Sequence, residues 1–521
     1  MDETTPASGL LRLGTALGIG LLAAICTYPW WGGVSPWAGV GFFVAAAAVA
    51  DMPQAALQMA PFPHFGILIA ALQYSLAPLA SHYYVSDSEY QVGSFTRYYA
   101  YGGPVLLAVA LGWTLTSLGL GSGTTASPRR QANPALAQEL DWLLWGGMLF
   151  DYFGSSFGGG GLAFVVVLLG SLRYLGAIGW MILDEPGWKG RLAAVLAYEV
   201  IRANRSAMFH DFILWALSLL AVYMGLRRPK VASFIAWLAA LIVFVFCLQD
   251  AKFEIRQATW FGGSEVTVFG KPVILSSWTR PFVSVLCVVD SACKPFAGGY
   301  TEESLSDSVT RFNQGWIIDC VLQHVPASEP YARGETILRA LEASFLPRVL
   351  APNKLRAGGR ENMERFAGRT LSEDTSMNLG FAGEMYANFG YWGGIAGCGI
   401  YALVLGLLCR WIAIRARSSP FWWAIAAYAG HWALKAESDV GSVLNYVTKA
   451  SLIVFAVTLC LPALRAELRG ESRKKKAESR KQRAAGREEE ADYGTTRRQD
   501  NGTRDQRSEG RGQKAEGRSK R

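Results

Sequence analysis

Runs of apolar residues long enough to cross a membrane recur along the chain from residue 10 to residue 464, separated by short charged connectors. A transmembrane helix needs roughly 20 mainly apolar residues, so the pattern predicts an all-α polytopic membrane protein with about 12 transmembrane helices. The run at 191–201 is too short for a straight crossing unless it uses neighbouring residues. The predicted spans cover about residues 10–28, 36–51, 66–82, 103–121, 138–153, 161–182, 191–201, 208–226, 231–249, 392–413, 420–436 and 443–464.

The basic residues of the short connectors predict the orientation in the membrane, because Lys and Arg favour the cytoplasmic side. Twelve spans bring the basic connectors to one side, together with the basic C-terminal tail. The connectors 32–35, 154–160 and 437–442, which fall on the other side, contain no Lys or Arg. We therefore expect both termini to be cytoplasmic. The basic connectors contain Arg129, Arg130, Lys189, Arg191, Arg227, Arg228, Lys230, Arg410, Arg415 and Arg417.

Four segments follow from this threading. Residues 1–249 form the N-terminal transmembrane helices, and residues 392–464 form the C-terminal ones. Between them, residues 250–391 form one large extracytoplasmic loop, which we expect to be mostly helical and to lie against the outer membrane face. Residues 465–521 are rich in Arg, Lys, Glu, Gly and Gln, with almost no large apolar residues, so they are predicted to be a disordered cytoplasmic tail.

The overall composition adds little to the pattern of apolar runs, because the mean hydropathy and the net charge are averages over the spans, the loop and the tail. Of the 521 residues, 51% are hydrophobic and 17% charged, yet the polar loop and tail hold the mean hydropathy at +0.19. The net charge of +9 arises in the tail, which has 19 Lys/Arg against 11 Asp/Glu. The eight cysteines show neither CxxC nor Cys/His spacing, and phosphate-loop, nucleophile-elbow and HExxH motifs are absent. We therefore expect no metal and no cofactor.

Charged residues within or beside the spans are costly in a bilayer and are therefore candidates for function. Arg173 lies midway along its span, where a salt bridge to Glu199 is the simplest alternative to a functional role. Arg202 and Arg205 are three residues apart, so both guanidinium groups can meet one anionic group, or else anchor to lipid headgroups. For Lys435, which caps the span before the last, reaching to the membrane interface is the favoured interpretation.

The loop contains a second set of candidates. Pro347 and Pro352 flank a turn that fixes Arg348 and Lys354, and fixed cations suit a diphosphate. Glu384 precedes an aromatic and glycine-rich return to the membrane, where shielding from water would suit a general base. The aromatic residues there are equally explained as an interfacial belt, although that explanation does not account for the glutamate.

The loop contains three short motifs, P-Y-x-x-G-x-T at 330–336, L-P-R-x-x-x-P-x-K at 346–354 and G-E-x-Y-x-N-F-G at 383–390. Together they resemble the O-antigen polymerase family, the bacterial oligosaccharide repeat-unit polymerases. The resemblance covers about residues 305–400, and the pattern of spans before one large external loop adds support. It implies a fold similar to that of GT-C-like glycosyltransferases with lipid-linked donors. The long charged tail is not part of the family's usual pattern.

The resemblance implies an enzyme of the bacterial inner membrane that joins undecaprenyl-diphosphate-linked oligosaccharides into a surface polysaccharide. Undecaprenyl diphosphate would leave, and no nucleotide, metal or nucleic acid would be bound. Besides the lipid-linked substrate and the bilayer, a chain-length regulator and a flippase are candidate partners. The site residues are then Glu384, Arg348 and Lys354 for catalysis, Arg202, Arg205, Arg311 and Arg356 for diphosphate binding, and Asp319, Asp374, His324 and Arg173 as secondary candidates.

Other functions stay open from the sequence. A ligase similar to the O-antigen ligases would use the same donor but transfer the glycan to a lipid A core or a protein. A transporter or flippase of lipid-linked oligosaccharides is a third possibility, although no internal repeat relates the two halves of the chain. A membrane scaffold is a fourth, in which the charges only set topology.

Overall fold

The chain is a helical membrane protein. The computed structural model describes residues 6–58, 60–85, 88–118, 120, 133–154, 161–206, 208–227, 230–260, 265–276, 280–293, 302–345, 359–372 and 375–470. Six helices among them are long and apolar enough to cross a bilayer, and the prediction of about 12 spans stays a prediction. The six are Pro36–Ala56, Phe62–Tyr84, Phe95–Ser117, Phe164–Leu183, Gly380–Ala416 and Val440–Cys460, with shorter apolar helices at Arg12–Cys26 and Ala232–Val245. Most of the predicted tail, from residue 471 onward, lies outside the described residues.

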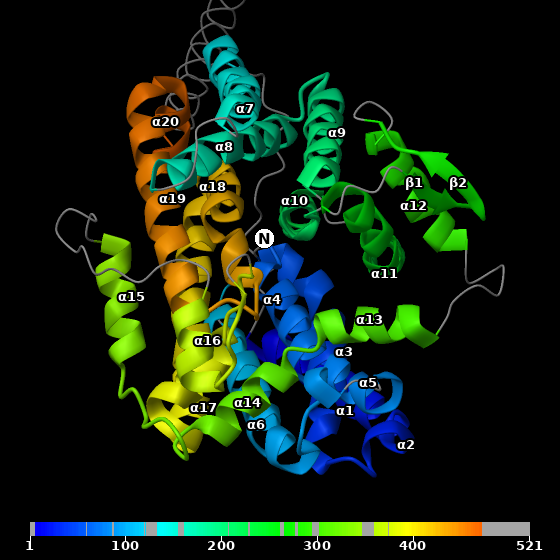
Figure 1. Cartoon of the computed structure of the whole chain (residues 1–521). Helices are drawn as coiled ribbons and strands as arrows, with labels where there is room; N and C mark the ends of the chain where they lie inside the picture. Colours follow the sequence, from blue (N-terminus) through cyan, green and yellow to red (C-terminus); the bar gives the residue numbers. More distant parts are fainter. Residues whose placement is uncertain are drawn as a thin grey trace, which may run out of the picture. The chain divides into compact units, whose positions relative to one another are not determined.

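Helices follow one another along almost all of the described chain (Figure 1). The first part contains α1 (Pro6–Cys26), α2 (Tyr28–Trp31), η1 (Pro36–Ala38), α3 (Gly39–Gln58), α4 (Phe62–Ala71), η2 (Leu72–Leu76), α5 (Ala77–Tyr84), η3 (Ser88–Tyr90), α6 (Phe95–Ser117), α7 (Pro134–Gly154), α8 (Gly161–Leu183), α9 (Trp188–Ser206), α10 (His210–Arg227) and α11 (Val231–Trp260). The second part contains β1 (Glu265–Val268), β2 (Lys271–Ile274), α12 (Arg280–Cys293), α13 (Glu302–Phe312), α14 (Gly315–His324), α15 (Glu335–Phe345), α16 (Arg360–Ala367), α17 (Gly380–Ala416), α18 (Phe421–Gly430), η5 (His431–Leu434), α19 (Val440–Cys460) and α20 (Pro462–Leu468).

Several helix boundaries differ from the predicted spans, and three of the differences bear on the site. The short run at 191–201 belongs to the longer helix α9, which extends from Trp188 to Ser206. Helix α11 continues past the predicted end at 249 and ends at Trp260. The added part of the helix contains polar residues. Helix α17 begins at Gly380, well before the predicted start at 392. Each extension includes polar residues. Because the spans were predicted from apolar runs, these polar parts of the helices were not included.

The described part of the predicted loop is mostly helical, as expected, but it also contains a β-hairpin. Strands β1 and β2 are antiparallel, with Val266 opposite Val273. Phe269 and Gly270 form the turn with positive φ values of 49° and 72°. Val266 and Val268 pack with Ile255 of α11 in a small core. The alternation of buried and exposed residues along β1 is short, so the sequence pattern does not separate it from the surrounding helices.

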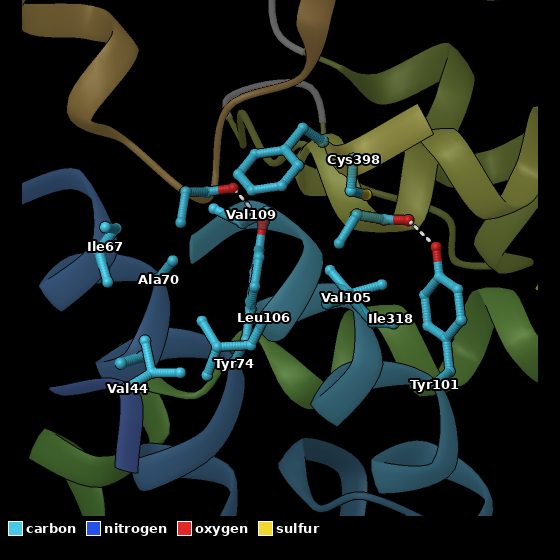
Figure 2. Packing of buried hydrophobic residues seen from close by; sticks show 14 of the residues in the cluster. Val44, Ile67, Ala70, Tyr74, Tyr101, Val105, Leu106, Val109, Ile318 and Cys398 are labelled. Atoms are coloured by element: carbon cyan, nitrogen blue, oxygen red, sulfur yellow. Dashed lines mark hydrogen bonds between the residues drawn. The ribbon is translucent and has the colours of Figure 1, made fainter. Parts of the chain in front are cut away.

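The main core forms where α3, α4 and α6 meet α17. Gly112 of α6 lies against Gly399 of α17, where an added Cβ would stand 2.6 Å from the Gly399 carbonyl oxygen. Small residues at such crossings let membrane helices approach closely. Figure 2 shows two buried tyrosines of this core: Tyr101 donates to the Ala382 carbonyl at 2.8 Å, and Tyr74 donates to the Ala436 carbonyl. Both hydroxyl groups are thereby satisfied away from water, which favours this packing.

A kink interrupts α17 near its start. Gly390 has φ 68° and ψ −161° inside the helix. An added Cβ at this position would lie 3.1 Å from the Tyr331 ring, so both the backbone conformation and the close approach favour glycine. The first turns of α17, which carry Glu384, therefore point in a different direction from the rest of the membrane-spanning helix.

Candidate anion-binding site

A cavity of about 290 Å³ lies beside the starts of two membrane-spanning helices. Ser376 to Asn378 line it immediately before α17, and Lys435 to Ser438 line it immediately before α19. We call it the cationic cavity. Its lining residues are Tyr90, Thr310, Arg311, Gln314, Trp316, Ile317, Ser376, Met377, Asn378, Trp432, Lys435, Glu437 and Ser438.

Side chains of η2 and α10 contact the segment 435–439 on one side of this cavity. The Tyr74 hydroxyl donates to the Ala436 carbonyl oxygen. Gln73 donates from Nε2 to Glu437 Oε2 at 3.3 Å, and His210 Nδ1 lies 3.3 Å from Glu437 Oε1. Gln73 lies in the π-helical turn η2, a type of turn that is frequent at functional sites. The Glu437 carboxylate is therefore held in a defined position at the cavity.

Cations outnumber carboxylates around the cavity. Arg311, at the end of α13, is exposed and makes no hydrogen bond or ion pair with any other described residue. Lys435 Nζ lies 4.2 Å from the centre of the Trp432 ring and 4.0 Å from Asp211 Oδ1. An Arg guanidinium offers paired donors to an oxyanion, and a Lys adds a compact charge. Arg311 and Lys435 are thus suited to hold an anionic group between them.

Two further cations on α11 belong to the same electrostatic environment. The Lys252 side chain is only 7% exposed, and burial together with the charges of Arg311 and Arg256 lowers its pKa to about 7. Burial and the charge of Arg311 also lower the pKa of Arg256. These positive charges repel one another. An anion bound in the cavity would reduce that repulsion.

Of the predicted diphosphate-binding residues, Arg311 lines the cavity. Arg202 instead pairs with Glu199, and the side chain of Arg205 lies outside the described residues. Lys252 and Arg256 were missed because α11 was predicted to end at 249. Their spacing of four residues, which places both on one helix face, was the available signal. The predicted residues Arg348, Lys354, Arg356 and Asp374 lie outside the described residues.

Glu384, the predicted base, is buried and does not line the cavity. Its Oε1 accepts a hydrogen bond from the Thr336 hydroxyl at 2.7 Å, and its Oε2 accepts one from the Val440 backbone N–H at 2.7 Å. Asn388 donates to the Glu384 carbonyl oxygen and to the Thr336 hydroxyl. This geometry suits a positioning residue that fixes the start of α19 beside the cavity, and its role as a base stays a prediction.

The secondary candidates Asp319 and His324 also lie away from the cavity lining. Asp319 is buried, and its carboxylate accepts hydrogen bonds from Arg97 Nη2, the Gly93 N–H and Gln323 Nε2 at 2.7–2.8 Å. These bonds join α14 to the start of α6, which is a structural role. The His324 ring lies against Gly368, where an added Cβ would be 2.9 Å from Nδ1.

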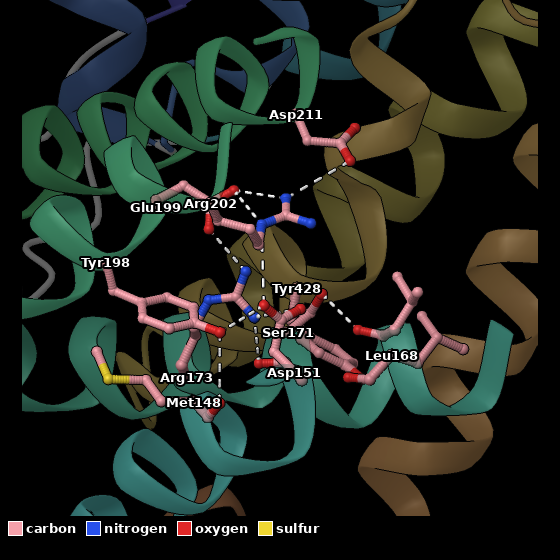
Figure 3. Close-up of polar contacts among 12 residues, drawn as sticks. Met148, Asp151, Leu168, Ser171, Arg173, Tyr198, Glu199, Arg202, Asp211 and Tyr428 are labelled. Atoms are coloured by element: carbon pink, nitrogen blue, oxygen red, sulfur yellow. Dashed lines mark hydrogen bonds and ion pairs between the residues drawn. The ribbon is translucent and has the colours of Figure 1, made fainter. Parts of the chain in front are cut away.

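A separate network of charges is enclosed between α7, α8, α9 and α10 (Figure 3). The salt bridge between Arg173 and Glu199, one of the two predicted alternatives, is present at 2.7 Å. Arg173 also lies 3.3 Å from Asp151, and Arg202 bonds Glu199 at 2.5 Å. The ring of Tyr174 lies 4.7 Å from the Arg173 guanidinium carbon. These buried charges are matched within the protein, so Arg173 has a structural explanation.

Comparison with known proteins identifies no relative: no protein-family model, no curated protein and no solved structure matches the chain. The family resemblance of the three loop motifs therefore stays a prediction. Within the part of the chain that the structure describes, no group of His, Cys, Asp or Glu residues is arranged to hold a metal ion. The cationic cavity is the feature that bears most directly on chemistry.

Proposed function

We propose that this chain is a glycosyltransferase of the bacterial inner membrane that polymerises undecaprenyl-diphosphate-linked oligosaccharide repeat units into a surface polysaccharide. The observation that carries the proposal is the surplus of cations in a cavity beside the starts of α17 and α19. A polyprenyl diphosphate carries its charge at the membrane surface and its apolar chain in the bilayer. A cationic site next to membrane-spanning helices is suited to both parts.

In the proposed reaction a hydroxyl group of the acceptor glycan attacks the anomeric carbon of the donor glycan. The bond between that carbon and the diphosphate oxygen breaks, and the lipid diphosphate leaves with the bonding electron pair. Arg311 and Lys435 would stabilise the negative charge that develops on it. Arg348 and Lys354 remain predicted members of the same group, on the resemblance of their motif.

The proton of the acceptor hydroxyl requires a base. Glu437 is a carboxylate that lines the cavity, whereas Glu384 is buried and does not line it. We therefore assign the base to Glu437 and a positioning role to Glu384. The hydrogen bond from Gln73 positions the Glu437 carboxylate, with the His210 ring beside it, and a fixed base is more effective than a mobile one.

The proposal places both termini in the cytoplasm and the cationic cavity on the opposite side. Reporter fusions within residues 302–345 and after residue 470 test this placement. Activity of an externally active reporter at the first position and of a cytoplasmic reporter at the second is expected. A cytoplasmic location of residues 302–345 would contradict polymerisation outside the cytoplasm.

Activity is tested with purified protein in liposomes that contain lipid-linked repeat units. We expect a ladder of longer lipid-linked glycans, and Arg311→Ala should lower its rate by roughly 10²–10³, as when one transition-state donor is removed. The matched control is Arg360→Ala, an exposed arginine that pairs with Glu364 on α16. Polymer formation at the full rate by the Arg311→Ala variant would remove the assignment of the leaving-group site.

A deletion strain separates the proposed function from its alternatives. Loss of a polymerase leaves single repeats on the final acceptor, because transfer continues without chain extension. Loss of a ligase leaves finished polymer on undecaprenyl diphosphate, and loss of a flippase leaves lipid-linked repeats on the cytoplasmic side. Only the first outcome supports the proposal.

A further inference from the structure

Helix α15 exposes a row of large apolar side chains. Leu338, Leu341 and Phe345 are 66%, 40% and 65% exposed. Their spacing of three and four residues places them on one face of the helix. Three such side chains in contact with water would be unfavourable, so the face points to an apolar partner.

The opposite face of α15 packs along the membrane-spanning helix α19. Ala340 of α15 lies against Gly441, where an added Cβ would be 3.1 Å from the Ala340 Cβ. Ser344 is buried at this contact and donates to the Ala340 carbonyl oxygen at 2.8 Å. The hydroxyl group is thus satisfied inside its own helix, as membrane helices require.

The two helices also start at the same level. Glu384 accepts hydrogen bonds from Thr336, in the first turn of α15, and from the N–H of Val440, the first residue of α19. From this common point α15 and α19 run side by side in the same direction (Figure 1). A helix of 11 residues is about 16 Å long, which is roughly half the thickness of the hydrocarbon core.

The charges near α15 are concentrated at its start and along one flank. Arg365 of α16 pairs with Glu335 at 3.1 Å, and Arg339 pairs with Glu335 at 2.8 Å and with Glu361 at 3.2 Å. Glu342 lies on the same flank as Glu335 and Arg339, by its helical position. The apolar face is thus bordered by charge on one side and by α19 on the other.

Helix α19, against which α15 packs, also exposes large apolar side chains. Leu452, Phe455 and Leu459 of α19 are 61%, 62% and 54% exposed, as expected for a membrane span that faces lipid. We propose that α15 dips into one leaflet beside α19 and that its Leu338–Leu341–Phe345 face contacts lipid acyl chains. This differs from the expectation that the loop helices lie against the outer membrane face. The inference does not depend on the proposed function.

Photo-crosslinking of the full-length protein in nanodiscs of a single defined phospholipid tests the inference. A benzophenone amino acid replaces Phe345, and intact mass identifies what it captures. The same amino acid at Phe455 serves as the positive control, because this residue lies on a membrane span. At Arg360, an exposed residue that pairs with Glu364 on α16, it serves as the control outside the proposed face.

Phospholipid adducts at Phe345, comparable with those at Phe455 and lacking at Arg360, are the expected result. A second benzophenone variant at Leu338 reports on the same face if the Phe345 variant fails to fold. Adducts at Phe455 without adducts at either α15 position would overturn the inference. Capture of a second copy of the chain at these positions would also overturn it, because the face would then be a protein interface.

Discussion

The enclosed network around Arg173 and the cationic cavity around Arg311 differ in how their charges are matched. In the network, Arg173 and Arg202 form ion pairs with Glu199, and Arg173 also pairs with Asp151. In the cavity, Arg311 forms no bond with another described residue, and burial together with the charges of Arg311 and Arg256 lowers the pKa of Lys252 on α11. Buried charges that are paired within the protein have a structural role. An excess of positive charge beside an open cavity instead favours the binding of an anionic ligand.

The two regions are linked through Asp211. Arg202 Nη2 lies 3.8 Å from Asp211 Oδ2, and Lys435 Nζ lies 4.0 Å from Asp211 Oδ1. Distance alone therefore does not distinguish the charges of the network from those of the cavity, because Asp211 lies near both. Variants on each side of Asp211 test the distinction, because they should affect different properties.

The largest expected effect is on stability, from the Arg173→Met variant. Removal of this guanidinium leaves Glu199 and Asp151 buried near each other, with Arg202 as the remaining partner. The variant should lose about 3–5 kcal/mol of stability, as when one partner of a buried ion pair is removed. Thermal unfolding in detergent measures it.

The matched variant for this test is Arg311→Ala, which should lower activity but change the unfolding temperature little, because an unpaired exposed residue contributes about 0.5 kcal/mol or less. If Arg173→Met unfolds at the wild-type temperature, the network is not the structural element described here. If Arg311→Ala unfolds much earlier, the cavity cation has a structural role as well.

Glu384 should give the next largest effect, because it lies beside the cavity but is fully bonded. Glu384→Ala leaves the Thr336 hydroxyl and the Val440 N–H without their acceptor, which should cost about 1–3 kcal/mol of stability. Glu384→Gln keeps one acceptor oxygen and should retain much of both stability and activity. A Gln variant with wild-type unfolding and no activity would instead restore Glu384 as the base.

If the cavity binds a diphosphate as proposed, we expect the charge on Lys252 to make the binding depend on pH. Its pKa of about 7 means that the side chain gains a proton as pH falls through neutrality. Affinity for a diphosphate such as farnesyl diphosphate should rise over that range, by at most about tenfold per pH unit. Calorimetry from pH 8 to pH 6 measures it.

Lys252→Met is the control, because the ionisation of the diphosphate itself contributes equally to both proteins. The difference between the two profiles is the contribution of Lys252. Identical profiles would place Lys252 outside the field of the bound anion.

The smallest effect is expected from the ion pair between Arg365 and Glu335. Hydrogen bonds from Arg365 lower the pKa of Glu335 below the model-compound value of 4.5. The resulting stabilisation is present above that value and is lost as pH falls through the lowered pKa. Both side chains are partly exposed, so water screens the pair and the effect should be small.

An Arg365→Gln variant should therefore show a slightly flatter decrease of unfolding temperature between pH 6 and pH 3. Arg360→Gln, which alters the exposed pair with Glu364, is the control. An unchanged acid profile in the Arg365→Gln variant would show that the pair contributes nothing to stability.

Some features of the fold could be predicted because they depend on neighbours in sequence. The apolar runs predicted a helical membrane protein, since helix length and hydrophobicity are local properties. The Arg173–Glu199 pair was a predicted alternative, because an isolated charge inside a span is unfavourable. The beginning of α17 at Gly380 was missed, because its first turns contain Glu384 and Asn388 and do not form an apolar run.

The sequence by itself determined that this chain lies in a membrane and that its loop carries candidate charges. Only the tertiary structure decided which charges meet. The cationic cavity combines residues near 90, 311, 377 and 435, and no spacing along the chain relates these segments. Long-range packing likewise placed Arg311 in the cavity lining and buried Glu384 outside that lining. Whether a charged side chain is bonded or available depends on neighbours brought from distant segments, and those neighbours exist only in the folded protein.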